Sequence, residues 1–271
     1  MSDYLEMVGN FLGLSDQVFS LFMTIFSIAL TVPMGLLAIR IFPYQRIVNS
    51  SDGISSFSSI IGILYAIILG YVLVTVYGNF CNTNAVVEKE VTILIELLRE
   101  AEGLPKHEAR KIHNATMDYI SSVIDEEWNH MIDTGKYHPN TLEKFSILYR
   151  IATNIKCQHQ EQLVFLKEVA DALSSLSTAR FERVSFASSR VPDILWELLL
   201  GVGLVSFGMA FFFPVESTRL RLALLCSTAG VMTFTTMLIY MLDRPYNGSL
   251  NVKPESLIRV REVEHEVGGK L

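Results

Sequence analysis

Four long apolar runs, separated by polar stretches, divide the sequence. They lie at 17–39, 57–80, 194–213 and 222–242. Each is close to the roughly 20 apolar residues that a helix needs to cross a bilayer. The pattern predicts an all-α integral membrane protein, with transmembrane helices 1 and 2 within 17–80 and transmembrane helices 3 and 4 within 191–242.

The second apolar run passes into a charged stretch with no signal that would end a helix. After residue 80 the sequence turns polar, and its first strong stop signals are Gly103 and Pro105. Before them, apolar residues keep the spacing of one helix face. They are Val87, Val91, Leu94, Leu98 and Ala101. One helix over 57–102, roughly 70 Å long, would therefore connect the bilayer to a soluble region.

The region between the second and third apolar runs has the pattern of a helical bundle. Apolar stripes predict helices over 106–133, 140–155 and 159–188, and Asn140 with Glu143 resembles a capping box. Nothing in 85–190 alternates with a period of two residues over a useful length. We expect a soluble helical bundle at 81–190, inserted between transmembrane helices 2 and 3.

Two shorter segments complete the chain. An acidic segment at 1–16 either lies along the membrane surface or forms a frayed tail, and a tail at 243–271 opens a short helix near Pro254. Four crossings place both termini and the bundle on one side of the membrane.

Composition supports a membrane protein and excludes several functions. The chain is 50% hydrophobic and 18% charged, with a mean hydropathy of +0.36, whereas soluble domains carry about 25% charged residues. A net charge of −6 gives no basic footprint for nucleic acid. The three cysteines are widely spaced, and Glu126 with His130, one turn apart, has no supporting motif. We predict no metal, no cofactor and no enzymatic activity.

Polar side chains occur on one side of the second transmembrane helix where it leaves the bilayer. Their spacing of i, i+4, i+7 places them on one face, where amide donors could replace the water that an anion loses. Deeper residues on that face could form an apolar constriction that closes by dewetting. Alternatively, the asparagines mark the water interface and the apolar residues belong to the core. The candidate lining comprises Tyr65, Leu69, Val72, Thr75, Asn79 and Asn82.

Three ionisable residues border the third and fourth apolar runs. Glu197 follows Trp196, an interfacial residue type, so we expect Glu197 at headgroup depth with Arg244 or Arg190 as its structural partner. Asp243 and Arg244 directly follow the fourth run, where they could clasp the helix end and influence gating.

Hydroxyl side chains are most frequent in the fourth run. They can bond back to carbonyls of their own helix, so their polarity does not require contact with water. They are Ser227, Thr228, Thr233, Thr235 and Thr236.

Four motifs, in order along the chain, resemble the bestrophin-like family, a bacterial and plastid membrane family of unknown function. The first is SSIIGILYAIILGYVLVTVY at 58–77, followed by VEKE at 87–90. The others are DYISSVIDEEWNHMIDTG at 118–135, VPDILWELLLGVG at 191–203 and LDRPYNGSLNVKPE at 242–255. The resemblance covers about residues 20–256.

The resemblance implies a layout and, by analogy, an activity. Bestrophins proper are pentameric anion channels with four membrane segments, a large cytosolic helical region and a pore lined by the second helix. Their paired aromatic residues in the pore neck and their calcium-binding acidic cluster have no recognisable counterpart here. We expect a homo-oligomer in the lipid bilayer that passes small inorganic anions. The alternative is a non-conducting scaffold or sensor whose bundle binds a partner.

Location and orientation follow from the same layout. We expect a multi-pass protein of the cell membrane, the inner membrane in a bacterium, with the bundle in the cytoplasm. Arginines lie in the short loops as well as on the bundle side, so the positive-inside rule does not decide the orientation.

Overall fold

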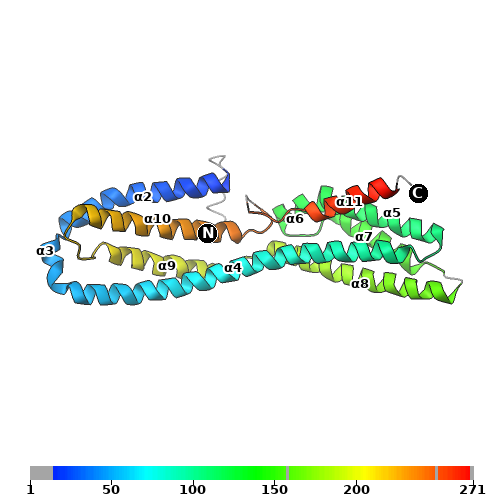
Figure 1. The fold of residues 1–271 in the computed structure, drawn as a ribbon, viewed down its shortest axis with the longest axis horizontal. Coiled ribbons are helices and arrows are strands. Elements are labelled where there is room, and N and C mark those ends of the chain that lie inside the picture. The colour runs from blue at the N-terminus through cyan, green and yellow to red at the C-terminus, as the bar shows by residue number, and fades with distance from the viewer. Residues whose placement is uncertain (1–14, 157–158, 248–249, 269–271) are drawn as a thin grey trace. The chain divides into compact units, whose positions relative to one another are not determined.

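The computed structural model of the chain describes residues 15–156, 159–247 and 250–268. These residues form helices and connecting segments and contain no strand (Figure 1). Most of the predicted N-terminal segment at 1–16 lies outside the described residues. The elements are α2 (Asp16–Ile41), α3 (Tyr44–Ile47), α4 (Ser51–Ala101), α5 (Lys106–Ser122), a π-helical segment (Val123–Glu127), α6 (Trp128–Thr134), α7 (Pro139–Thr153), α8 (Gln160–Ser188), α9 (Asp193–Ala210), α10 (Thr218–Leu242) and α11 (Glu255–Gly268).

The described residues divide into two compact units. The first comprises the described residues through Gly78 together with Arg190–Arg244 and Leu250. The second comprises Asn79–Ser189, Pro245–Asn247 and the described residues from Asn251 onward. Helix α4 contributes residues to both units as one α-helix of 51 residues.

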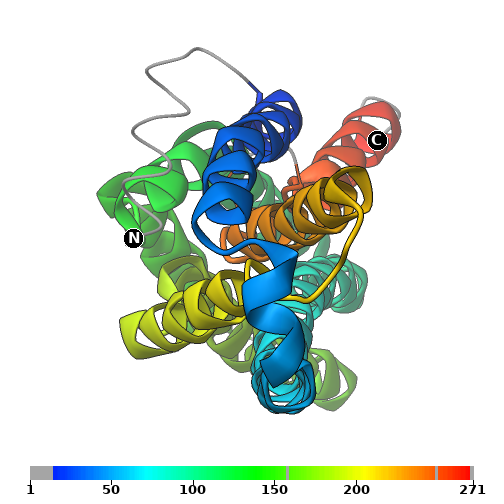
Figure 2. The same cartoon turned by 90° about the vertical axis from the view of Figure 1, so that its left-hand side faces the viewer.

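The first unit contains the apolar helices. By length and composition, α2, the helix that ends at Ala101, α9 and α10 could each cross a membrane. Helices α2 and α10 pack side by side, as Figures 1 and 2 both show. Gly35 allows this contact, because a Cβ atom there would lie 2.7 Å from a methyl carbon of Leu222. This unit also exposes large apolar side chains such as Leu204 and Val74, as a surface in contact with lipid would.

Hydroxyl groups of α10 are satisfied inside the unit, as the sequence predicts. Ser227, Thr228, Thr235 and Thr236 each donate to a carbonyl one turn earlier, at 2.8–2.9 Å. Thr233 instead donates to the Ser27 hydroxyl of α2. None of these hydroxyls needs water, so the segment remains compatible with a bilayer.

Arg221 ties three helix ends together at the short loops. Its buried guanidinium donates to the carbonyls of Phe42, after α2, and Phe211, after α9. Carbonyls at helix C-termini lack partners and carry partial negative charge, so a cation is favoured there.

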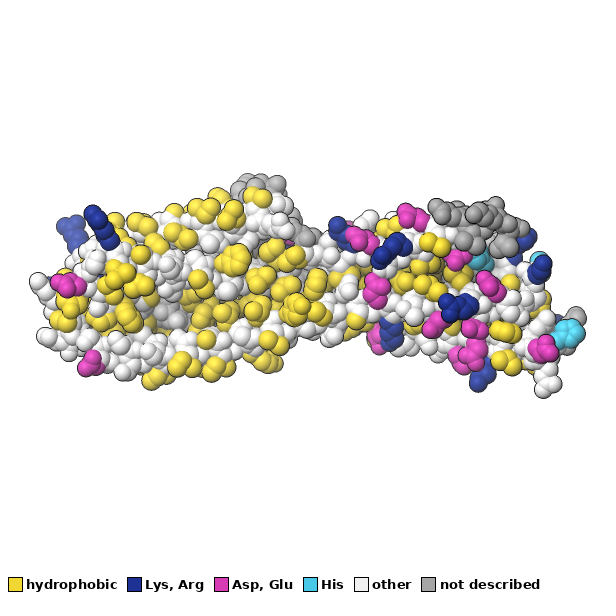
Figure 3. Space-filling view, in the orientation of Figure 1, with side chains coloured by type: hydrophobic (Ala, Val, Ile, Leu, Met, Phe, Trp, Pro, Cys, Tyr) yellow, Lys and Arg dark blue, Asp and Glu magenta, His cyan; other side chains and the backbone are white. Residues whose placement is uncertain are grey.

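The second unit has a helical apolar core of its own. Leu94, Ile112, Leu148 and Leu176 bring α4, α5, α7 and α8 into this core, and each is 0% exposed. Charged side chains gather over this unit, whereas the visible face of the first unit is mainly apolar or uncharged (Figure 3). Helix α11 packs on the core through Leu257 and Val260.

Several predicted boundaries need correction. Residues 40–56, between the first two apolar runs, would be expected to form a loop from the turn formers at 49–53. They instead contain α3, a 3-10 turn (Val48–Ser50) and the first turn of α4, so Ser51, Asp52 and Gly53 are helical despite their turn propensity. The predicted capping box at Asn140 is wrong. Helix α7 begins at Pro139 after His138, without a side-chain cap, and the Asn140 amide donates to Glu126 at 2.6 Å. The predicted helix at 106–133 is helical throughout but contains the π segment.

Candidate functional site

Helix α4 places the deeper candidate lining residues toward its own chain. Tyr65 is 9% exposed and Val72 is 1% exposed, while Leu69 is half-buried. The Tyr65 ring lies against α9, since a Cβ atom on Gly203 would be 3.0 Å from Tyr65 Cε2. Tyr65 and Val72 are therefore packed within the first unit, and only Leu69 of these three retains a partly open surface.

The three polar candidates lie at the edge of the buried side of α4. Thr75 is half-buried and donates through Oγ1 to the Tyr71 carbonyl at 2.8 Å. Asn79 is half-buried and Asn82 is exposed. Neither asparagine amide makes a hydrogen bond within the described residues. Both amides are consequently available to donate to a ligand, an ion or another subunit.

The other side of α4 is apolar and open in the single chain. Its most exposed large apolar side chain is that of Val74, at 72%. It has the same character over several turns, including Ile60, Ile63 and Ile67. The amides of Asn79 and Asn82 thus lie beside a surface suited to lipid or to a neighbouring subunit.

Asp243 joins the start of α9 to the end of α10. One carboxylate oxygen accepts a 2.7 Å hydrogen bond from the Val191 backbone N–H, and the side chain is 4% exposed. Burial raises the pKa of Asp243, and this rise outweighs the lowering by the Val191 N–H, the nearby Trp196 indole N–H and the charges of Arg190 and Arg244. The Arg244 guanidinium lies 4.9 Å from the centre of the Tyr240 ring. The structure thus places the Asp243 carboxylate where it holds two membrane-helix ends together.

Glu197 is exposed on α9. It makes no ion pair or hydrogen bond among the residues that the structure describes. The expected pairing of Glu197 with Arg244 or Arg190 is therefore absent from this part of the chain.

A buried cluster of charges lies at the centre of the second unit, and the sequence reasoning missed it. Glu90, Glu127 and Arg183 are 0% exposed, and Arg180 is 3% exposed. Arg183 donates through Nε to Glu90 at 2.5 Å and through Nη2 to Glu127 at 2.7 Å. Arg180 donates to the other Glu127 oxygen at 2.7 Å. The two carboxylates and two guanidiniums balance in charge.

Aromatic and polar groups complete the coordination of this cluster. The buried Tyr119 hydroxyl donates to Glu90 at 2.7 Å, and the His138 backbone N–H donates to Glu127 at 3.1 Å. The Arg180 guanidinium stacks 4.8 Å from the centre of the Tyr137 ring, while Arg183 lies 5.8 Å from that of Trp128. These contacts offset part of the large penalty for removing charges from water.

The cluster shifts the pKa of its members in opposite directions. Burial raises the pKa of Glu127, but the hydrogen bond from Arg180 and the charges of Arg183 and Arg180 outweigh it, so the pKa is lowered. Burial, together with the charge of Glu90, raises the pKa of Tyr119 well above its usual range. Glu127 is therefore ionised at neutral pH and Tyr119 is a neutral donor.

A sequence pattern could have indicated this cluster, because its charged residues occupy positions in apolar helical stripes. Glu90 falls in the apolar stripe formed by Val87, Leu94 and Leu97, at spacings of three and four residues. Arg180 and Arg183 continue the stripe of Leu173 and Leu176 in the same way. A charge at a stripe position indicates either an error in the helix assignment or a buried ion pair, and the structure shows the second.

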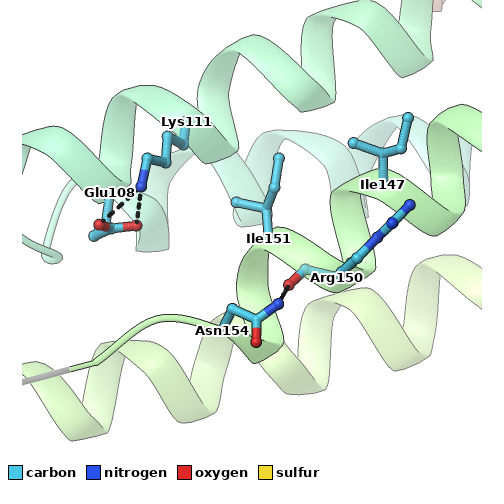
Figure 4. A pocket seen from close by; sticks show the side chains of 6 residues that line it. All are labelled: Glu108, Lys111, Ile147, Arg150, Ile151 and Asn154. Atoms are coloured by element: carbon cyan, nitrogen blue, oxygen red, sulfur yellow. Dashed lines mark hydrogen bonds and ion pairs between the residues drawn. The ribbon is translucent and has the colours of Figure 1, made fainter.

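A cleft lies between α5 and α7 (Figure 4). It has a volume of about 560 Å³. Lys111 donates to Glu108 at 3.2 Å and the Asn154 amide donates to the Arg150 carbonyl at 2.9 Å, so part of its polar lining is self-paired. The cleft holds no nucleophile with a neighbouring base. No group of three or more His, Cys, Asp or Glu side chains within the described ranges could hold a metal ion.

Comparisons with known proteins agree with this architecture. A crystal structure of a bacterial bestrophin homologue from Klebsiella pneumoniae, carrying a point substitution, matches with a TM-score of 0.69 at 14% identity over 89% of this chain and 98% of that chain. A second variant of a Klebsiella pneumoniae homologue matches with a TM-score of 0.63 at 17% identity, over 89% and 97% of the two chains. A further crystal structure, described as a membrane protein, matches with a TM-score of 0.64 at 16% identity, over 89% and 96%. These identities establish a shared fold.

Sequence comparison then identifies the family. Among curated proteins, none matches this chain significantly. The family model of the Bestrophin-like domain matches residues 25–257, which is most of the chain. This membrane protein therefore belongs to the Bestrophin-like domain family.

Proposed function

We propose that the chain is one subunit of an oligomeric ion channel in which α4 lines a path for anions. The observation that carries this proposal is the pair of amides at Asn79 and Asn82 on α4, which make no hydrogen bond among the described residues. Amide N–H groups can donate to an anion as it loses water. Membership of the Bestrophin-like family supports the same reading.

The proposed lining contains fewer residues than the set expected from the sequence. Leu69, Thr75, Asn79 and Asn82 keep surface that could face a path in an oligomer. Tyr65 and Val72 are packed within the first unit and are left out of the proposed lining. The apolar side of α4, centred on Val74, would contact lipid or the adjacent subunit.

The proposed arrangement in the cell follows the family layout. Helices α2, α4, α9 and α10 would span the cell membrane, the inner membrane in a bacterium. The second unit would be a soluble bundle inserted between two of these spans and facing the cytoplasm. A single cysteine introduced by Lys111→Cys, on a cysteine-free background, tests the orientation. An impermeant thiol reagent applied outside intact cells should leave the introduced cysteine unmodified. Modification by the external reagent would show that the second unit faces the outside.

Recordings from purified protein in planar bilayers test conduction. We expect anion-selective currents, with Asn79→Ala and Asn82→Ala each changing the chloride-to-sodium permeability ratio several-fold. Val74→Ala is the matched control, because Val74 lies on the same helix but on its exposed apolar side. If the protein passes no current under varied voltage, halide and pH, the channel proposal is refuted. Unchanged selectivity in both alanine variants would remove the asparagines from the path.

A second candidate function is a non-conducting scaffold or sensor. It is favoured by exposed apolar side chains on α8, namely Leu163, Val164 and Phe181, each more than half exposed. Such residues on a unit otherwise rich in charge are suited to a protein partner. Silent recordings together with stoichiometric binding of a partner through α8 would favour this candidate over the channel.

A further inference from the structure

The buried charge cluster joins helix α4 to helix α8 within the second unit. Glu90 of α4 receives the Arg183 guanidinium and the Tyr119 hydroxyl, from α8 and α5. Glu90 follows Asn82 by eight residues on the same helix, or about 12 Å along its axis. A contact that fixes Glu90 therefore also fixes the rotation of the adjacent part of α4.

The cluster is better suited to fixing a geometry than to supplying stability. Replacing a buried ion pair with neutral residues of similar volume is often neutral or stabilising, because desolvation offsets the attraction between the charges. Directional bonds from a planar guanidinium, in contrast, are satisfied in only one orientation. Arg183 uses its Nε and Nη2 atoms on two different carboxylates, which restricts the orientation further.

The neighbours of Glu90 penalise any other rotation of α4. A rotation that brought the preceding residue to the same place would present Lys89 to Arg183, with charge repulsion. A rotation in the other sense would present Val91 and leave a buried guanidinium without one of its carboxylates. Both alternatives are costly, so the cluster discriminates among registers through repulsion as well as attraction.

We propose that the cluster of Glu90, Glu127, Arg180 and Arg183 sets the rotational register of α4 and thereby positions Asn79 and Asn82. The consequence for gating rests on the proposed channel function, whereas the register itself does not. A change in the bundle that loosens Glu90 would turn the asparagine side of α4 relative to its neighbours.

The double variant Glu90→Gln/Arg183→Met separates register from stability. It removes one negative and one positive charge and leaves the Glu127–Arg180 pair balanced. The readout is the rate at which an impermeant thiol reagent modifies a cysteine introduced by Asn79→Cys, with Cys81, Cys157 and Cys226 replaced by serine, in lipid nanodiscs. We expect this rate to change about 2- to 30-fold, the range that coupling mutations produce, with little change in the thermal midpoint.

Glu182→Gln is the matched control. The Lys89–Glu182 ion pair joins the same two helices one residue before Glu90 and Arg183, at 2.9 Å, but it lies at the surface. We expect its loss to leave the modification rate unchanged. Tyr119→Phe, which removes one hydrogen bond to Glu90 and keeps every charge, should change the rate in the same direction by a smaller factor.

The outcomes keep the two proposals distinguishable. An unchanged rate in both the double variant and Tyr119→Phe would overturn the register proposal, whether or not the protein conducts. A changed rate in a protein that never conducts would support the register and contradict the channel. If the protein conducts, the double variant should also show an altered open probability. Altered rates with an unaltered open probability would overturn the link to gating. If the double variant does not fold, the Tyr119→Phe rate alone decides.

Discussion

Replacement of Glu127 by glutamine tests the buried cluster at the residue that contacts both arginines. The Glu127 side chain is 0% exposed and accepts 2.7 Å bonds from Arg180 and Arg183. Glutamine has nearly the same shape, so packing is preserved. It carries no charge and has one acceptor oxygen in place of two. The cluster would then hold two guanidiniums against the single carboxylate of Glu90.

The expected loss of stability is large. Removing one partner from a buried ion pair costs about 3–5 kcal/mol, because the remaining charge stays desolvated. A destabilisation of 1 kcal/mol lowers the unfolding midpoint by roughly 2–4 °C in domains of this general size. Glu127→Gln should therefore lower the midpoint of the second unit by about 6–20 °C.

Intrinsic fluorescence can report this transition directly. The chain has two tryptophans, and Trp128 lies in the second unit beside Arg183. Trp196→Phe leaves Trp128 as the only indole, so its emission during heating follows the unfolding of the environment of the cluster. Measurements in one detergent at neutral pH would compare the variants on equal terms.

The adjacent residue provides a matched control and a clear refutation. Glu126 lies on the same π-helical segment but is solvated, and it accepts hydrogen bonds from Ser122 and Asn140. Glu126→Gln should shift the midpoint far less than Glu127→Gln. Equal shifts in the two variants, or a Glu127→Gln midpoint within 2 °C of the unsubstituted protein (below about 1 kcal/mol), would refute the reasoning from burial.

Three further predictions concern pH, a helix clasp and a close contact. The pKa of Glu127 is lower in the folded protein than its ordinary value of 4.5, so its contribution to stability is complete above that pH and is lost as the pH falls through the folded pKa. Midpoints measured from pH 7 to pH 3 should fall, and Glu127→Gln should flatten that fall; a parallel decline in both proteins would contradict this assignment. Asp243→Ala should destabilise the first unit by about 1–3 kcal/mol, because the buried Val191 N–H loses its acceptor. Asp243→Asn keeps an acceptor and avoids burying a charge, so its thermal midpoint should stay closer to that of the unsubstituted protein; the reverse order would show that the negative charge itself matters. Gly103→Ala should destabilise the second unit by about 1–3 kcal/mol, since its Cβ would lie 2.3 Å from the Phe165 ring, and a Phe165→Leu background should reduce the loss.

Long apolar or amphipathic segments could be predicted from the sequence to within a few residues. Helix α8 begins at Gln160 and ends at Ser188, next to the predicted limits of 159 and 188. Helix α4 ends at Ala101, just before the stop signals at Gly103 and Pro105. These segments succeed because periodic burial and helix-ending residues act locally.

Features that depend on contacts distant in sequence could not be predicted in the same way. Asn140 has the spacing of a capping residue, yet its amide donates to Glu126, which lies on another element. Glu90 and Arg183 are 93 positions apart, and each alone resembles an ordinary solvated charge. Their positions within apolar stripes gave the available signal, but only the packing of α4 against α8 shows that they pair.

In the candidate site, too, helical spacing could be predicted from the sequence, whereas contacts between helices could not. Helical spacing correctly places Thr75, Asn79 and Asn82 on one continuous helix, α4. It does not show that Tyr65 lies against Gly203 of α9, because that contact depends on how two apolar helices pack. Spacing alone therefore could not show which of the candidate residues are packed against another helix.

Single-particle imaging of the purified protein in lipid nanodiscs would show whether α4 lines an ion path, because such a path requires several copies around one axis. We expect a closed ring of subunits in which α4 is the helix nearest the axis and Asn79 and Asn82 face it. A monomer, or a ring in which α4 lies at the lipid-facing periphery, would rule out a path lined by α4.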